Sequence, residues 1–239
     1  MSIYKSNNFD LEYFSYGDLS NSPIVLIPPG LGQASHFDDL VKNLEDKYFV
    51  ITINLPGVGL SESESGELKD LALYISELLN KLEIKNPAIL GESYGGSLAI
   101  EIDKLIKVKK LILLGSGEYF NPLIRFILKL LFLPALKSKV LRRSYAKLIN
   151  PLGIFNFKEF SDLQLLQINK RWLSVLNYKI NEAKSNTPVV YYLANKDIIV
   201  NKFSTKKLKE KFVQFKIYSV KGSHFEYEKR YLEAKLELI

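Results

Sequence analysis

The chain has 239 residues, of which 47% are hydrophobic and 25% are charged, and its formal net charge is +7. That length fits one large domain, or one domain with an insertion, and it is enough to bury a substantial core. The absence of cysteine excludes a disulfide framework, a thiolate metal site and a cysteine nucleophile. No stretch reaches the roughly 18 uninterrupted apolar residues of a membrane span, and the N-terminus lacks a secretory pattern, so we expect a cytoplasmic protein.

Strand and helix patterns alternate through the first half of the chain. Strands are expected over residues 9–16, 24–27, 48–54, 87–91 and 110–114, the first of them antiparallel. Helices are expected over 67–82 and 93–106, and also from Ser35, where Asp38 completes a capping-box-like start. This alternation is typical of a mainly parallel, twisted sheet flanked by helices.

The pattern changes after residue 118. Residues 119–185 show only helical patterns, rich in leucine, aromatic residues and lysine. Strands then return over 189–193 and 215–220, with a helix over 204–212 between them and a final helix from 225. We therefore predict a core domain of residues 1–118 and 186–239, interrupted by a helical insertion of residues 119–185.

The positive charge is concentrated in this insertion. Residues 119–158 contain eight basic residues and no acidic one: Arg125, Lys129, Lys137, Lys139, Arg142, Arg143, Lys147 and Lys158. A solvated basic face is the simplest interpretation. Attraction of an anionic substrate, or weak contact with a membrane surface through this basic, apolar segment, are alternatives. A nucleic-acid partner is not expected, because no recognition motif accompanies the charge.

The segment Gly91–Gly96 carries the strongest chemical signal. Its G-x-S-x-G pattern is centred on Ser93, and it lies between an expected strand and an expected helix, which is the context that the motif requires. A turn this sharp crowds the positions two before and two after the serine, where Gly91 and Gly95 stand. We predict that Ser93 is a nucleophile on such an elbow, rather than a helix-capping serine in a glycine-rich turn.

A serine hydroxyl needs a base, and the base needs an acid to orient it. Of the two histidines, His224 follows the last expected strand, at the edge of the sheet where α/β folds bind ligands. Asp197 follows the preceding strand, and the order Ser, Asp, His is that of α/β-hydrolases. We predict His224 as the base and Asp197 as the acid, with Glu118 as a weaker alternative acid. His36 could line a pocket, but its position favours the first turn of a helix.

Stabilisation of an oxyanion requires backbone N–H donors. Tyr94, which follows the nucleophile, is expected to supply one. The second is expected from the loop at residues 28–32, where Pro28 and Pro29 have no N–H, so that Gly30 or Leu31 must donate.

The loop at 28–32, the turn at 54–61, the elbow at 91–96, Asp197 and His224 together resemble the α/β-hydrolase superfamily. The resemblance is to the cap-bearing branch, which includes esterases, carbon–carbon bond hydrolases and proline iminopeptidases. It implies an α/β-hydrolase fold with a helical cap inserted after the sixth strand, which is where residues 119–185 begin. Two positions depart from the family: Pro28-Pro29 replaces a frequent His-Gly, and Asn54 replaces a frequent aspartate.

These observations favour a serine hydrolase that cleaves a carboxylic ester of small to medium acyl size, without metal or organic cofactor. The insertion holds twelve Lys and Arg and few acidic residues to bind a substrate amino group, which disfavours an aminopeptidase. Phe120, Phe126 and Trp172 are candidate pocket walls. A carbon–carbon hydrolase, a lipase, an iminopeptidase-like enzyme and a non-catalytic binding protein remain alternatives, and the natural substrate and the oligomeric state stay open.

Overall fold

The computed structural model describes residues 1–117, 122–141, 160–180, 184–200, 202–224 and 227. Its centre is a single sheet with the strand order β1-β2-β4-β3-β6-β7-β8-β9, with β5 paired to β2. The strands are β1 (Ser2–Lys5), β2 (Phe9–Tyr16), β3 (Ser22–Ile27), β4 (Tyr48–Ile53), β5 (Glu62–Ser63), β6 (Ala88–Glu92), β7 (Lys110–Leu114), β8 (Val189–Ala194) and β9 (Phe215–Val220). Pairs that involve β2 are antiparallel and all the other pairs are parallel, which confirms the prediction of a mostly parallel sheet.

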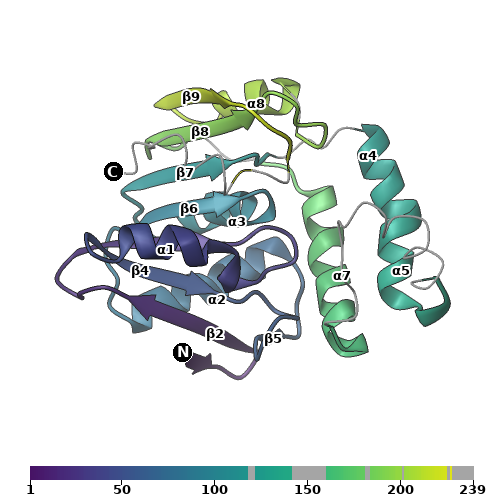
Figure 1. Cartoon of the computed structure of the whole chain (residues 1–239), viewed down its shortest axis with the longest axis horizontal. Coiled ribbons are helices and arrows are strands. Elements are labelled where there is room, and N and C mark those ends of the chain that lie inside the picture. The colour runs from purple at the N-terminus through teal and green to yellow at the C-terminus, as the bar shows by residue number, and fades with distance from the viewer. Residues whose placement is uncertain (118–121, 142–159, 181–183, 201, 225–226, 228–239) are drawn as a thin grey trace.

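Helices cover both faces of this sheet (Figure 1). One face packs on α2 (Leu68–Lys81) and α3 (Tyr94–Asp103), and the other on η1 (Ala34–Phe37) and α1 (Asp38–Leu44). Neighbouring residues of a strand enter opposite layers, as Ile89 and Leu90 of β6 do, and both are fully buried. The central strands are therefore apolar on both sides, as expected for parallel strands covered twice.

The helix that was expected to begin at Ser35 begins differently in the structure. The chain enters through the 3-10 turn η1 before α1 begins, and neither element has a side-chain cap. The prediction of a capping box at Ser35 and Asp38 is therefore wrong. A capping box is present instead at α7 (Asp162–Asn177), where Ser161 and Gln164 bond each other's backbone N–H groups.

Between β7 and β8 the described regular structure is helical. A continuous run consists of α4 (Pro122–Ile127), the π-helical turn η2 (Leu128–Phe132) and α5 (Leu133–Lys137), and α7 follows. Leu133 and Leu136 pack on Leu165 and Ile168 of α7, and in Figure 1 α4 and α5 lie beyond α7, away from the sheet. The boundaries proposed for this insertion stay predictions, and the final helix expected from residue 225 lies outside the described residues except at Tyr227.

Further strand and helix positions agree with the sequence patterns to within a few residues, including α8 (Lys202–Lys209). In the part of the chain that the structure describes, no helix is both long and apolar enough to cross a bilayer.

Candidate active site

Ser93 stands in a strained turn between β6 and α3. Its backbone angles are φ 51° and ψ −109°, in a region that a residue with a Cβ rarely adopts. The Ser93 N–H donates to the carbonyl of Leu114 at the end of β7, at 2.8 Å, and this bond holds the turn to the neighbouring strand. The conformation lifts the hydroxyl away from the sheet at the N-terminus of α3.

The glycines on either side make this turn possible. A Cβ on Gly91 would lie 2.6 Å from the Cα of Gly96, so the strand could not approach the helix as it does. A Cβ on Gly95 would lie 2.7 Å from the carbonyl oxygen of Pro28, in the loop after β3. Gly95 is therefore small because the elbow and the loop at 28–32 are in backbone contact, which explains how the two parts share one site.

Ser93, His224 and Asp197 meet at the carboxyl edge of the sheet. Ser93 Oγ lies 2.9 Å from Nε2 of His224, and Nδ1 of His224 lies 2.8 Å from Oδ2 of Asp197. A carboxylate can only accept, so Nδ1 carries the proton, which leaves Nε2 of the neutral imidazole as the acceptor for the serine hydroxyl. Ser93, Asp197 and His224 follow β6, β8 and β9, respectively. His224 is 131 positions after Ser93 and 27 positions after Asp197 in the sequence.

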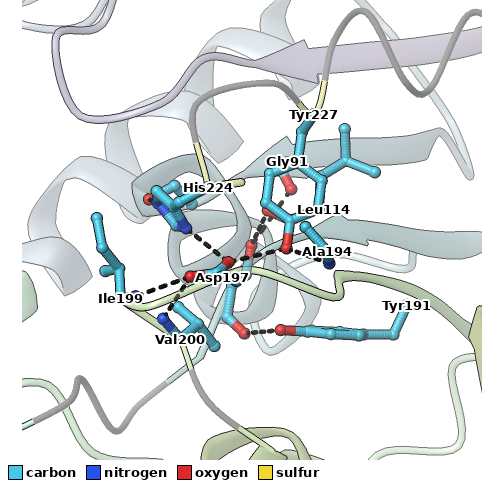
Figure 2. A network of polar contacts seen from close by, with 11 residues as sticks. Gly91, Leu114, Tyr191, Ala194, Asp197, Ile199, Val200, His224 and Tyr227 are labelled. Atoms are coloured by element: carbon cyan, nitrogen blue, oxygen red, sulfur yellow. Dashed lines mark hydrogen bonds and ion pairs between the residues drawn. The ribbon is translucent and has the colours of Figure 1, made fainter. Parts of the chain in front are cut away.

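The Asp197 carboxylate is buried and fully engaged. Oδ1 accepts the N–H groups of Ile199 and Val200, each at 2.8 Å, and Oδ2 accepts from His224 and from the hydroxyl of Tyr227 (Figure 2). Burial acts to raise the pKa of Asp197, but the hydrogen bonds that it accepts, and the positive charge that His224 carries when it is protonated, outweigh burial, so the pKa lies below its ordinary value. Asp197 is thus held as an anion beside the imidazole.

Tyr227 was not predicted from the sequence. Its hydroxyl donates to Asp197 Oδ2 at 2.9 Å and accepts the N–H of Ala194, at the end of β8, at 2.8 Å. Burial and the neighbouring Asp197 charge raise its pKa, so the phenol stays protonated. Gly115 has φ 53°, and a Cβ there would lie 2.6 Å from Cζ of the Tyr227 ring. Tyr227 stands only three positions after His224 in the sequence, but no sequence pattern connects it with Asp197.

The loop after β3 is folded by its own backbone. The N–H of Gly32 donates to the carbonyl of Pro29 at 2.8 Å, and the carbonyl of Gly32 accepts from the N–H of Leu55 at 2.9 Å. Gly32 is therefore not available to an oxyanion. Neither Gly30 N–H nor Leu31 N–H has a hydrogen-bond acceptor among the described residues, and the N–H of Tyr94, first in α3, has no acceptor within its helix. These N–H groups are thus available to a ligand oxygen, and their role as an oxyanion hole stays a prediction.

Two side chains of helix α7 donate hydrogen bonds to the backbone of this loop. Nε1 of Trp172 donates to the carbonyl of Gly30 at 3.1 Å, and Nη2 of Arg171 donates to the carbonyl of Leu31 at 3.3 Å. Because the carbonyl and the following N–H of one peptide plane point in opposite directions, the bond to Gly30 fixes where the Leu31 N–H points. Trp172, predicted as a pocket wall, thus bonds the backbone of the loop after β3, and its contact with a substrate stays a prediction.

Arg171 is fully buried, and its guanidinium lies 5.4 Å from the centre of the Tyr94 ring. Nε and Nη1 of Arg171, and the hydroxyl of Tyr94, have no hydrogen-bond partner among the described residues. Burial lowers the pKa of Arg171 to about 10, so it remains a cation at neutral pH. A positive charge therefore lies against Leu31 and Tyr94, two of the residues predicted to donate N–H groups to an oxyanion.

Asn54, one of the two departures from the family, has a structural explanation. Its Oδ1 accepts the Ala34 N–H and its Nδ2 donates to Oε2 of Glu12, both at 2.7 Å. The same Glu12 oxygen accepts the N–H of Leu60 at 3.0 Å. An amide satisfies both sides, whereas an aspartate would face a second buried carboxylate.

The remaining predicted residues are placed as follows. Glu118 and Phe120 lie outside the described residues, and Phe126 on α4 is 60% exposed, on the outer surface of the insertion. His36 lies in η1, as expected, and its Nε2 is 2.9 Å from Oε2 of the buried Glu92, next to the nucleophile. Among the described residues no group of three or more His, Cys, Asp or Glu could hold a metal ion.

The geometry supports one kind of chemistry. An imidazole nitrogen lies within hydrogen-bond distance of a serine hydroxyl, and the other ring nitrogen is held by a carboxylate. The residue after the serine begins a helix, whose first N–H groups have no acceptor within the helix. Such an arrangement can remove the serine proton as the oxygen attacks a carbonyl and can stabilise the resulting oxyanion.

Comparisons with known proteins concern the fold. A family model described as the alpha/beta hydrolase fold matches residues 23–161. The chain is 33% identical over 107 residues to the nonribosomal peptide synthetase agiA of Aspergillus flavus, covering 44% of this chain and 1% of that protein. It is 29% identical over 114 residues to the uncharacterized hydrolase YugF of Bacillus subtilis, covering 46% of this chain and 42% of that protein.

A solved structure of similar fold is that of MGS-M2, an alpha/beta hydrolase enzyme from a Medee basin deep-sea metagenome library. Its TM-score is 0.80 at 16% identity, covering 98% of this chain and 94% of that one. This likeness concerns the fold. The matched segments span less than half the length of each of the curated relatives.

Proposed function

The chain belongs to the alpha/beta hydrolase fold family, and from this premise we propose that it is a serine hydrolase that cleaves a carboxylic ester. The observation that carries the proposal is the unbroken sequence of contacts from Ser93 through His224 to Asp197, at 2.9 and 2.8 Å. These are the groups that an acyl transfer to water needs, in the order in which it needs them.

In the proposed mechanism, Nε2 of His224 takes the hydroxyl proton of Ser93 as Oγ attacks the ester carbonyl. The carbonyl oxygen becomes an oxyanion, held by the N–H of Tyr94 and by that of Gly30 or Leu31. The imidazolium then protonates the departing alkoxide, which leaves an acyl-serine. Water, deprotonated by the same histidine, attacks this acyl group, and collapse of the second oxyanion releases the acid and restores Ser93.

Asp197 contributes by orienting and charge-stabilising His224. Its carboxylate accepts four hydrogen bonds, one from His224 and three from Ile199, Val200 and Tyr227. Because His224, Val200 and Tyr227 lower its pKa, the carboxylate is anionic when His224 becomes an imidazolium, and it stabilises that charge.

An ester is preferred over a peptide because of the charge of the insertion. An aminopeptidase must bind a cationic amino terminus, and the insertion carries twelve Lys and Arg against three Asp and Glu. The buried cation Arg171, beside Leu31 and Tyr94, adds positive charge near the reacting carbonyl. Such a site disfavours a cationic substrate and suits a neutral or anionic one.

A series of p-nitrophenyl esters from acetate to palmitate tests this proposal, with proline p-nitroanilide as the competing cationic substrate. We expect ester hydrolysis that Ser93→Ala or His224→Ala lowers by at least about 10³-fold. Ser76→Ala is the matched control, because that buried hydroxyl bonds only the carbonyl of Ala72 in its own helix, and it should keep full activity. Faster cleavage of the anilide than of every ester would contradict the proposal.

The same panel separates the alternatives. A rise in kcat/KM with acyl length favours a lipase over a short-acyl esterase, and turnover of a vinylogous 1,5-diketone without ester turnover favours a carbon–carbon hydrolase. A non-catalytic binding protein would turn over none of these substrates and would not react covalently at Ser93.

A further inference from the structure

The outer face of the insertion carries a stripe of exposed apolar side chains. Leu123, Phe126, Ile127 and Leu130 are exposed by 65, 60, 37 and 57%. They stand at positions i, i+3, i+4 and i+7 of the continuous run α4–η2, so they share one side of it. We call these four residues the outer stripe.

The outer stripe is not the side of the helical run that packs against the rest of the protein. Further along the run, Leu133 and Leu136 of α5 are buried against α7, and Leu128 packs against the same cluster. The run is therefore apolar both toward the protein and away from it. A helix of this kind in water leaves a contiguous apolar patch exposed, and such patches mark contact surfaces.

Cations, without acidic neighbours in sequence, accompany the stripe. Arg125 and Lys129 lie within the same run, where both bond the side-chain oxygen of Asn177, at 3.3 and 2.7 Å. Lys137 and Lys139 follow at its end, and Lys139 pairs with Asp162 at 3.0 Å. The run thus carries an apolar stripe on its outer side, cations on the side that faces Asn177 of α7, and further cations at its end. This combination is complementary to an apolar layer bordered by negative charge.

We propose that α4, η2 and α5 form a peripheral contact with an anionic lipid surface. The outer stripe enters the boundary between headgroups and acyl chains, while Arg125, Lys129, Lys137 and Lys139 remain at the level of the phosphates. The run has 16 residues, from Pro122 to Lys137, and no described helix meets the requirements for crossing a bilayer, so it lies on the surface. Val140 and Leu141, which follow the run, are exposed by 70 and 47%.

This contact has a consequence for the substrate, and that consequence rests on the proposed function. α5 packs on α7, and α7 bonds the carbonyls of Gly30 and Leu31 beside the nucleophile. A protein attached through α4 and α5 therefore holds its reaction site one helix layer from the lipid. The substrate class that fits this arrangement is a lipophilic ester that partitions into the membrane.

Sedimentation with lipid vesicles tests the contact. The full chain is mixed with vesicles of phosphatidylcholine alone or of phosphatidylcholine with 30% phosphatidylglycerol. We expect binding to the anionic vesicles at least about tenfold stronger than to the neutral ones, and weaker binding at 0.5 M than at 0.1 M salt, because salt screens the charge term. The stripe variant Leu123→Ser/Phe126→Ser/Leu130→Ser should lose at least about tenfold in affinity.

A matched control uses apolar residues that are equally exposed on the sheet domain. Leu19 and Val213 are 77 and 60% exposed, and Leu19→Ser/Val213→Ser should bind vesicles like the unchanged chain. A charge variant, Lys137→Glu/Lys139→Glu, should lose the preference for anionic vesicles while its stripe is intact. Circular dichroism and Ser93 labelling without vesicles verify that each variant is folded.

Three results would overturn the contact: no sedimentation with either vesicle, equal binding by the stripe variant, or a change from dimer to monomer in the stripe variant without vesicle binding. The last would assign the stripe to a second copy of the chain. Vesicle binding by a chain whose Ser93 does not react would contradict the proposed function and leave the contact standing. A reactive Ser93 in a chain that binds no vesicle would contradict the contact and leave the proposed function standing.

Discussion

The hydroxyl of Tyr227 lies 2.9 Å from Oδ2 of Asp197, the same oxygen that accepts from Nδ1 of His224 at 2.8 Å. This tyrosine also accepts the N–H of Ala194 at the end of β8, so it connects the carboxylate to the sheet. Asp197 is therefore held both to the end of the strand that precedes it and to His224, through one tyrosine hydroxyl.

Replacing Tyr227 by phenylalanine tests this connection. The ring still fills the space against Gly115, but Asp197 loses a donor and the buried Ala194 N–H loses its acceptor. A hydrogen bond to a charged group is worth about 1.5–3 kcal/mol, so kcat should fall by about 10- to 100-fold with little change in KM. The pKa of Asp197 should rise toward its ordinary value, because the carboxylate loses a donor. Tyr4→Phe on the edge strand is the control, and a rise in KM alone would point to a substrate contact instead.

The stability of the protein should depend on pH through Asp197. Its pKa is lowered in the folded state, so its contribution is present above the unfolded value of about 3.9 and is lost as the pH falls through the folded value. The free energy of unfolding of Asp197→Asn should therefore differ from that of the unchanged chain most above pH 5 and converge with it toward pH 3. Urea unfolding at each pH measures this, and a difference that grows toward acid would show the opposite sign.

Gly95 and Gly117 form a matched pair near the elbow. A Cβ on Gly95 would lie 2.7 Å from backbone atoms of Ile27 and Pro28, whereas one on Gly117 would meet only side-chain atoms at 3.5 Å. Gly95→Ala should lower the free energy of unfolding by about 1–3 kcal/mol and abolish ester hydrolysis, because the elbow must move away from the loop at 28–32. Gly117→Ala should leave both unchanged. Equal effects of the two substitutions would refute the backbone contact.

Asn54→Asp restores the residue that the family often has, yet here it should be harmful. A carboxylate oxygen would replace Nδ2 of Asn54, which donates to Oε2 of Glu12 at 2.7 Å, so the hydrogen bond would be lost and two carboxylates would face each other. Repulsion between two buried carboxylates should cost about 1–3 kcal/mol at pH 8 and less at pH 5, where one of them binds a proton. The double variant Glu12→Gln/Asn54→Asp should recover stability, and thermal unfolding of the single and double variants checks it.

The sequence predicted the parts of this molecule that depend on local pattern. The alternation of apolar runs and helical spacing predicted the parallel sheet, and the elbow at Ser93 was identifiable because strand, glycine, serine and helix follow one another within a few residues. Asp197 and His224 were found through their places after strands, and the structure brings both to Ser93.

Long-range contacts were not predictable in this way. The bonds from Arg171 and Trp172 to a loop about 140 positions away depend on how α7 packs, and a helical pattern cannot specify its partner. Tyr227 reaches Asp197 only because Gly115, on a third segment, leaves room for its ring. Phe126, expected to line a pocket, is 60% exposed because the helical run packs on α7 through Leu128, Leu133 and Leu136, which follow α4.

The most direct test of the proposed function is covalent labelling of Ser93. The chain is treated with a fluorophosphonate at pH 7.5, and mass spectrometry follows the intact protein and its peptides. One label per chain is expected, on the peptide that contains Ser93. Labelling should be absent in Ser93→Ala, at least about 10³-fold slower in His224→Ala, and unchanged in Ser76→Ala. An unlabelled chain, or a label on a different serine that persists in Ser93→Ala, would contradict the assignment of Ser93 as the nucleophile.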